Sequence, residues 1–155
     1  ILLTHGHVDH LTQLHALKEK TGAEVLMHRK DEFLLQDVGH HAMIFGLPDP
    51  GTPKPDQFIE DGNVINIGTI QVNVLHTPGH SPGSVTYQIE NRLIVGDLIF
   101  AGSIGRTDLP GGNFDDLMQS VRTRIFTLPD STMIYPGHGP ETTVGQEKQF
   151  NPFFW

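Results

Sequence analysis

The sequence predicts an α/β fold, and three patterns along its 155 residues support this prediction. In the first third, short apolar runs typical of strands alternate with segments of helical periodicity. Between residues 64 and 95, four strand patterns follow one another with turn residues between them. A longer helical repeat then covers residues 114–128. With 37% apolar residues, a chain of this length can form one domain with a substantial core.

The first elements alternate between strand and helix. Residues 1–4 predict a strand, and residues 11–21 have leucines at helical spacing before Gly22, a natural helix end. Residues 23–28 predict a second strand and residues 31–37 a second short helix. Residues 39–55 contain four prolines, so they are expected to be irregular. A loop of this length between strong patterns is more often a lid or substrate wall than a linker.

Strands dominate the middle of the chain. The predicted strands cover residues 64–67, 70–75, 84–89 and 92–95, with a hairpin tip at Glu90 and Asn91. In the helix over residues 114–128, Asn113 can cap the start, and Pro129 ends the pattern. Residues 132–135 predict the last strand. The aromatic tail, residues 151–155, is expected to pack back on the body.

Composition narrows the classes of function. A net charge of −8 disfavours broad contact with nucleic acid or anionic lipid. No run approaches the roughly 20 apolar residues of a membrane helix. Because cysteine is absent, the chain has no disulfides and no thiolate ligands, so any metal must be held by nitrogen and oxygen. Ten histidines in such a chain require an explanation.

The chain begins without methionine, and its first candidate ligand is already at position 5. We therefore expect an N-terminally incomplete fragment, residues 1–155, of a single domain whose first strands precede it. A targeting signal would then also lie upstream. We expect the protein to be cytoplasmic.

The segment from His5 to His10 holds three histidines and a carboxylate within six residues. His5 and His7 stand two apart, so on an extended backbone their rings project the same way. Asp9 and His10 follow where the chain must turn into a helix. Such a motif can surround two metal ions; the alternative is a polar loop with surface histidines.

Three later segments repeat one design, in which an apolar strand ends and a metal-capable residue sits in the following glycine-rich turn. These residues are His80, Asp97 and His138. If the strands end at the same edge of a sheet, their turns bring these side chains to the histidine motif. Turns with proline and glycine hold ligands rigidly and let the backbone approach closely.

Seven side chains then suffice for two metal ions. Each ion receives three ligands of its own, and one carboxylate, with its two oxygens, can bridge both. Four protein ligands per ion with room for a water is an open, catalytic arrangement. The two sets and the bridging residue are His5, His7 and His80; Asp9, His10 and His138; and Asp97.

The pattern His-x-His-x-Asp-His with distant His80, Asp97 and His138 resembles the metal-binding signature of the metallo-β-lactamase-fold superfamily, and the resemblance runs through the whole chain. It implies a four-layer αββα sandwich with the site at one edge, between the two sheets. Residues 76–84, 96–100, 105–108 and 136–140 are similar to the glyoxalase II (hydroxyacylglutathione hydrolase) branch. The compact bacterial type without a C-terminal helical domain is most similar, since the chain stops soon after His138.

This resemblance implies hydrolysis of a small-molecule thioester, S-lactoylglutathione being the type substrate, by attack of a metal-bound hydroxide. Asp9 would both ligate a metal and orient the nucleophile or pass its proton. The cofactors would be two divalent ions per chain; zinc is expected, and iron or manganese also suits mixed histidine and aspartate ligands.

The residues that contact substrate in the glyoxalase II branch are matched less completely in this sequence than the metal ligands. In glyoxalase II a basic residue nine positions after the bridging aspartate helps hold glutathione, and Arg106 occupies that position. The alternative is a structural arginine paired with Asp108. The tyrosines of the family that contact glutathione are replaced here by Asp108 and Pro140. The residues therefore support hydrolysis better than they support glutathione as the carrier.

Two other functions remain open. Persulfide dioxygenases share this branch and hold one Fe(II) with residues matching His5, His80 and Asp97, the arrangement of two histidines and one carboxylate used for oxygen chemistry. The other alternative is a non-catalytic binding module of the same fold. The remaining histidines have simpler interpretations. His15 is expected on a surface, and His76 is expected to pack or form a hydrogen bond beneath the site.

Overall fold

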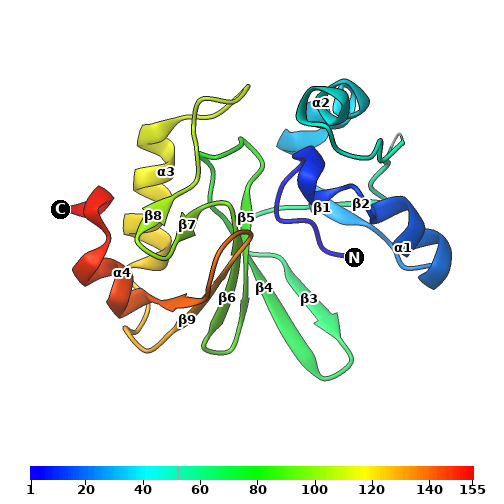
Figure 1. Ribbon diagram of the computed structural model, residues 1–155. Coiled ribbons are helices and arrows are strands. Elements are labelled where there is room, and N and C mark those ends of the chain that lie inside the picture. Colours follow the sequence, from blue (N-terminus) through cyan, green and yellow to red (C-terminus); the bar gives the residue numbers. More distant parts are fainter. Residues whose placement is uncertain (52) are drawn as a thin grey trace.

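The structure is a computed structural model that describes residues 1–51 and 53–155, and its central element is a six-stranded sheet (Figure 1). The strand order is β10-β9-β6-β5-β4-β3. Within this sheet only the β6–β9 pair is parallel. Five of the six strands were predicted and lie within one residue of the predicted bounds. The strands are β3 (Val64–Ile67), β4 (Ile70–His76), β5 (Val85–Ile89), β6 (Arg92–Gly96), β9 (Met133–Pro136) and the unpredicted β10 (Thr142–Thr143).

A second, two-stranded parallel sheet consists of β1 (Leu26–His28) and β2 (Gln57–Ile59). The prediction of a strand over residues 1–4 was wrong. In this segment only Leu2 forms a β-bridge, to Leu26. The reason is that the backbone changes sheets here. Leu3 donates to the carbonyl of Leu26, whereas the Thr4 carbonyl accepts from Val85 in the large sheet.

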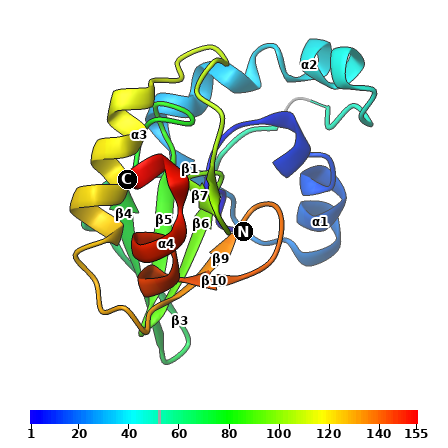
Figure 2. The ribbon, with the colours of Figure 1, turned by 60° about the vertical axis from the view of Figure 1, so that its left-hand side comes forward.

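The two sheets and four helices form the predicted four-layer αββα sandwich (Figures 1 and 2). α1 (Leu14–Thr21) and α2 (Val38–Phe45) lie on the side of the small sheet. α3 (Phe114–Ser120) and α4 (Val144–Phe150) cover the outer face of the large sheet. Three apolar clusters fill the spaces between the layers, and the middle one, between the sheets, contains the fully buried Val72, Val74 and Val85.

Local signals explain where the predicted helices begin and end. The Asn113 side chain accepts a hydrogen bond from the amide of Asp116, as expected of a cap. α3 then continues as a π-helical segment, Val121–Ile125, and ends before Pro129. α1 begins three residues later than predicted and ends at Gly22, whose φ of 66° is the left-handed conformation of a helix end. The predicted helix over residues 31–37 is a 3₁₀ helix, Arg29–Leu35.

The irregular segment predicted for residues 39–55 was wrong in its first part, which forms most of α2. The prolines begin only at Pro48, so they do not prevent a helix before it. Val38 and Ala42, four residues apart, are buried on one face and attach the helix to the body. Thr52, also within that prediction, lies outside the described residues.

The C-terminal segment contains elements that the sequence analysis missed. α4 begins after Thr143, whose hydroxyl caps it by accepting from the amide of Gln146, and it is short with few apolar positions. In the aromatic tail, Phe154 packs on Phe126 with ring centroids 4.8 Å apart, as predicted. Trp155, however, is 81% exposed. A small hairpin, β7 (Ile99–Phe100) and β8 (Ser103–Ile104), also went unpredicted.

Glu147 on α4 is a buried carboxylate that attaches this helix to the β7–β8 turn. It accepts hydrogen bonds from the Gly102 amide (2.9 Å), the Thr142 hydroxyl (2.6 Å) and the Asn151 side-chain amide (2.8 Å). In Glu147→Gln an NH₂ group faces these donors, so we expect the free energy of unfolding to fall by about 1–3 kcal/mol in urea titration. The exposed Glu141→Gln is the control. Equal stabilities of the two variants would contradict this role.

His28 and His76 stack in parallel where β1 and β4 end, with ring centroids 4.4 Å apart. Burial, and then the neighbouring His76, lower the pKa of His28 to about 4. Between about pH 6.5 and pH 4 the unfolded chain therefore binds a proton that the folded chain does not, so acidification destabilises the fold.

When the pH is lowered from 7.5 to 5, we expect the free energy of unfolding to fall less in His28→Asn than in the parent protein. Asparagine retains an acceptor for the Lys30 amide, which now bonds to Nδ1 of His28. Urea unfolding at several pH values measures this difference. The exposed His15→Asn serves as control, and a pH dependence in His28→Asn identical to that of the parent would refute the assignment.

Within the described ranges, no helix has the length and apolar character needed to cross a membrane.

Candidate metal centre

Four loops meet at one edge of the large sheet and carry all seven predicted ligands. β4, β6 and β9 run in the same direction, because β5 is antiparallel to β4 and β6 while β6 and β9 are parallel. The loops after these strands provide His80, Asp97 and His138 at the same edge, as predicted. The fourth loop enters from the small-sheet side and continues into a 3₁₀ turn, Val8–His10.

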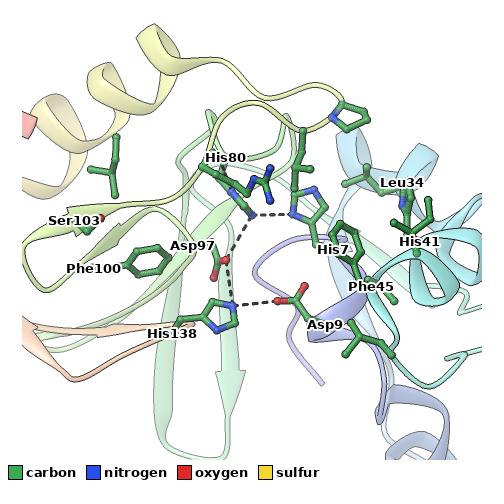
Figure 3. A pocket seen from close by; sticks show the side chains of 17 residues that line it. His7, Asp9, Leu34, His41, Phe45, His80, Asp97, Phe100, Ser103 and His138 are labelled. Carbon is green, nitrogen blue, oxygen red and sulfur yellow. Dashed lines mark hydrogen bonds and ion pairs between the residues drawn. The ribbon is translucent and has the colours of Figure 1, made fainter.

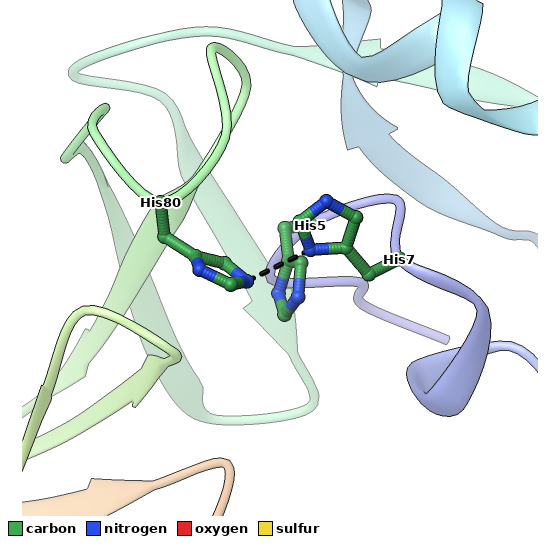
Figure 4. Close-up of side chains that lie close together, drawn as sticks. All are labelled: His5, His7 and His80. Atoms are coloured by element: carbon green, nitrogen blue, oxygen red, sulfur yellow. Dashed lines mark hydrogen bonds between the residues drawn. The ribbon is translucent and has the colours of Figure 1, made fainter. Parts of the chain in front are cut away.

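The first group of ligands is a buried triad of histidines, His5, His7 and His80 (Figure 4). Their ring centroids lie 4.5–4.9 Å apart, and Nδ1 of His7 is 2.8 Å from Nε2 of His80. Nδ1 of His80 lies 2.8 Å from the carbonyl oxygen of Arg106 and must donate to it. With its proton on Nδ1, the ring can use Nε2, which faces His7, as a metal ligand.

The second group combines two carboxylates and two histidines, Asp9, His10, Asp97 and His138 (Figure 3). Nε2 of His138 is 3.1 Å from Oδ2 of Asp9 and 3.4 Å from Oδ2 of Asp97. Nε2 of His10 is 3.3 Å from Oδ1 of Asp97. Donor atoms of this kind at these separations can surround a single ion.

Asp97 lies between the two groups. Its Oδ2 is also 3.7 Å from Nε2 of His80, which belongs to the triad. The structure therefore places this carboxylate where the sequence analysis predicted a bridging ligand. That it bridges two metal ions stays a prediction.

Some buried polar atoms of the centre lack hydrogen-bond partners, as expected of side chains that bind a metal. Within the described chain, Nε2 of His5 and Nε2 of His7 are buried without any hydrogen-bond partner. Burial, followed by the neighbouring histidines, lowers the pKa of His5 well below its ordinary value and that of His7 to about 4. Both rings are therefore neutral near pH 7, which is the form that binds a metal.

The carboxylate of Asp97 and the ring of His10 stabilise each other as an ion pair. Burial acts against the charge on each group, but their mutual interaction outweighs it. The pKa of His10 is consequently raised and that of Asp97 lowered. Asp97 is thus an anion at neutral pH, as a metal ligand must be.

Gly137 shows how closely the backbone approaches the centre. A Cβ at this position would lie 2.2 Å from Oδ1 of Asp97 and 2.8 Å from Cε1 of His10. The Gly137 amide also donates a hydrogen bond to the carbonyl of Gly96 (2.8 Å), which continues the pairing of β9 with β6. Glycine is therefore required for these two ligands to sit side by side, in agreement with the predicted close approach.

Asp31 is a component of the site that the sequence analysis missed. Its carboxylate is fully buried and accepts from the Gly6 amide (2.9 Å), the Ser81 hydroxyl (2.7 Å) and the Gly83 amide (2.5 Å). Gly6 separates His5 from His7, and Ser81 follows His80. Asp31 therefore joins the two loops of the triad, and burial raises its pKa despite these hydrogen bonds. No local signal distinguishes it from an acidic residue in the first turn of a helix.

A cavity of about 650 Å³ opens above the centre. Ligands of both groups line its floor, and most of the remaining lining comes from the 3₁₀ helix Arg29–Leu35, from α2 and the residue Leu47 after it, and from the β7–β8 hairpin and the following loop (Figure 3). The segment predicted as a lid or substrate wall thus contributes a wall, although as a helix. The lining residues that are not predicted metal ligands include Leu34, His41, Ile44, Phe45, Leu47, Phe100, Ser103, Ile104, Arg106, Leu109 and Pro110.

Arg106 lines the cavity and is paired with Asp108. Nε lies 2.7 Å from Oδ1 and Nη2 lies 2.8 Å from Oδ2 of this carboxylate. The structural alternative from the sequence analysis is therefore present, and substrate binding by Arg106 stays a prediction. Of the other histidines, His15 is exposed as predicted. His76 donates from Nε2 to the carbonyl of Pro82, also as predicted.

Comparison with known proteins agrees with the fold and with the resemblance found in the sequence. The family model of the Metallo-beta-lactamase superfamily matches residues 1–138. The chain is 40% identical to hydroxyacylglutathione hydrolase GloC of Haemophilus influenzae and 42% identical to probable metallo-hydrolase YqgX of Bacillus subtilis. Each match covers 99% of the chain and 74% of the relative. The structure of TTHA1623 in a di-iron-bound form superposes with a TM-score of 0.89 at 41% identity, covering 99% of this chain and 76% of that one.

Proposed function

Since the chain belongs to the metallo-beta-lactamase superfamily and is a metal-dependent hydrolase of that fold, we propose that it hydrolyses a thioester with two metal ions. S-lactoylglutathione is the example that the hydroxyacylglutathione hydrolase relative suggests. One observation carries this proposal. Two adjacent groups of histidine and aspartate, with Asp97 between them, form the floor of an open cavity.

The donor set distributes the residues between two ions. His5, His7 and His80 would hold one ion. The other would be held by Asp9, His10 and His138. Asp97 would contact both. Zinc is our first expectation, and the di-iron form of TTHA1623 keeps iron open. Ions bound here would lower the pKa of a water molecule and polarise the thioester carbonyl.

The chain's own residues have separate tasks in the reaction. In hydrolysis, water adds to the carbonyl carbon, the carbon–sulfur bond breaks, and the products are a carboxylic acid and a thiol. Asp9 lies at the edge of the centre, where its carboxylate can orient the water and accept its proton. Because a thiol ionises near pH 8.5, the sulfur can leave without a general acid.

The positions of the ligands are maintained by groups behind them. The Arg106 carbonyl fixes the tautomer of His80, and Asp31 holds the loops that carry the triad. On the substrate side, we propose that the guanidinium of Arg106 contacts the thiol carrier. Asp108 would then have to give up one or both of its hydrogen bonds with this guanidinium.

Metal analysis combined with a thioester assay on the intact protein tests the proposal. We expect two metal ions per chain and hydrolysis of S-lactoylglutathione, followed by the loss of thioester absorbance, with and without oxygen. Hydrolysis in the absence of oxygen would exclude a dioxygenase as the main activity. Oxygen consumption with glutathione persulfide and one iron per chain would replace our proposal with that alternative. Metal binding without turnover of any thioester would indicate a non-catalytic module.

A further inference from the structure

The wall of the cavity formed by α2 and its neighbours is apolar and open to water. It consists of Leu34, Ile44, Phe45 and Leu47, with His41 as its polar member. Figure 3 labels Leu34, His41 and Phe45 on this side of the cavity. Ile44 and Phe45 are 60% and 52% exposed, because the packing of the helix depends on its other face. Large apolar side chains that remain in water beside a binding site are typical of a surface that a ligand covers.

The polar lining residues that are neither metal ligands nor part of α2 are Ser103 in β8 and Arg106 in the loop after it. Phe100, Ile104, Leu109 and Pro110 of the same segment also line the cavity, and Arg106 is the only lysine or arginine among the described residues around it. A thioester has two parts, the acyl group and the thiol carrier. A polar carrier such as glutathione finds its hydrogen-bond partners on the Arg106 side, which leaves the acyl group to the α2 wall.

Size points in the same direction. A cavity of about 650 Å³ falls in the range of pockets that enclose a whole drug-sized ligand, so it can hold an extended acyl chain together with the thioester group and the adjoining part of the carrier. A hydroxyl on a short acyl group would gain nothing from the aliphatic and aromatic side chains of this wall, whereas each methylene of a longer chain would bury apolar surface.

From this wall, and resting on the proposed thioester hydrolysis, we propose that the preferred substrates carry an extended apolar acyl chain. The α2 wall is then a determinant of specificity, with Ile44 and Phe45 as its main contacts.

The first experiment varies only the acyl group. Acetyl-, butanoyl-, hexanoyl- and lactoylglutathione are compared with the metal-loaded chain, and we expect kcat/KM to rise about threefold per added methylene. Binding of S-methyl- and S-hexylglutathione, which cannot be hydrolysed, is measured by calorimetry. We expect the Kd to tighten with chain length by a similar factor, independently of turnover.

Variants of one helix locate the effect. Ile44→Ser and Phe45→Ser change exposed side chains, and each is expected to reduce the ratio of hexanoyl to acetyl kcat/KM by about tenfold. Met43→Ser is the matched control, because Met43 is 73% exposed on the same helix and is not among the residues that line the cavity. It should leave both rates unchanged.

The possible outcomes distinguish a failure of this inference from a failure of the proposed thioester hydrolysis. Hydrolysis of lactoylglutathione with no dependence on chain length, or an equal effect of Met43→Ser and Ile44→Ser, would overturn the inference alone. Absence of hydrolysis with every thioester would overturn the proposed function. Tighter binding of S-hexylglutathione, lost in Ile44→Ser, would then still support an apolar ligand at this wall.

Discussion

Replacing Asp97 with asparagine is expected to lower thioester hydrolysis by about a thousandfold and to reduce the metal content from two ions to one or none. An ion supplies several kcal/mol of transition-state stabilisation, and each ~1.4 kcal/mol corresponds to a factor of ten in rate. Asp97 approaches both groups of donors, with its oxygens 3.3 Å from His10 and 3.7 Å from His80. Its removal would therefore affect both ions. Elemental analysis and kcat/KM for one thioester give the two readouts.

The exposed Asp115→Asn is the matched control for Asp97→Asn, because it makes the same chemical change away from the centre. It should retain both metal and activity. Unchanged hydrolysis in Asp97→Asn with two ions still bound would contradict the dinuclear arrangement.

Replacing Asp31 with asparagine is expected to loosen the triad without removing a ligand. An NH₂ group would face at least one of the donors of Gly6, Ser81 and Gly83, so a buried hydrogen bond is lost. We expect the free energy of unfolding to fall by about 2–4 kcal/mol, in urea titration. Metal affinity should fall by about 10- to 100-fold, as is usual when a group that orients ligands is removed.

The affinity of Asp31→Asn is measured by competition with a chelator at a temperature where the variant is fully folded. This condition separates positioning of the ligands from general stability. Asp37→Asn, an exposed aspartate six positions further on, is the control. A variant that is less stable but binds metal as tightly as the parent would show that Asp31 only stabilises the fold.

The sequence predicts well which side chains meet at the candidate centre, because each has a local signal. A strand that ends in a turn rich in glycine and proline places its next polar residue at a defined edge, and three such turns carry His80, Asp97 and His138. The parallel directions of the three strands then bring these turns together. The first step needs only local signals, whereas the second depends on the parallel pairing of β6 with β9, which the sequence analysis had to assume.

The missed features depend on contacts between segments far apart in the chain. α2 is stabilised by the burial of Val38 and Ala42 rather than by strong helical signals, so the nearby prolines dominated the prediction. Asp31 binds groups 25 to 52 positions away in sequence. β7 and β8 have two residues each, below the length at which alternation can be recognised.

The ligands of the centre come from two different layers of the sandwich. The loop with His5 belongs to the small-sheet side, whereas the loops with His80, Asp97 and His138 extend from the large sheet. An ion shared between them would act as a cross-link in a chain that has no cysteine. By mass action, free metal at 100 times its Kd adds about 2.7 kcal/mol to folding. The supply of metal would therefore set what fraction of the chain is folded, as well as how fast it turns over substrate.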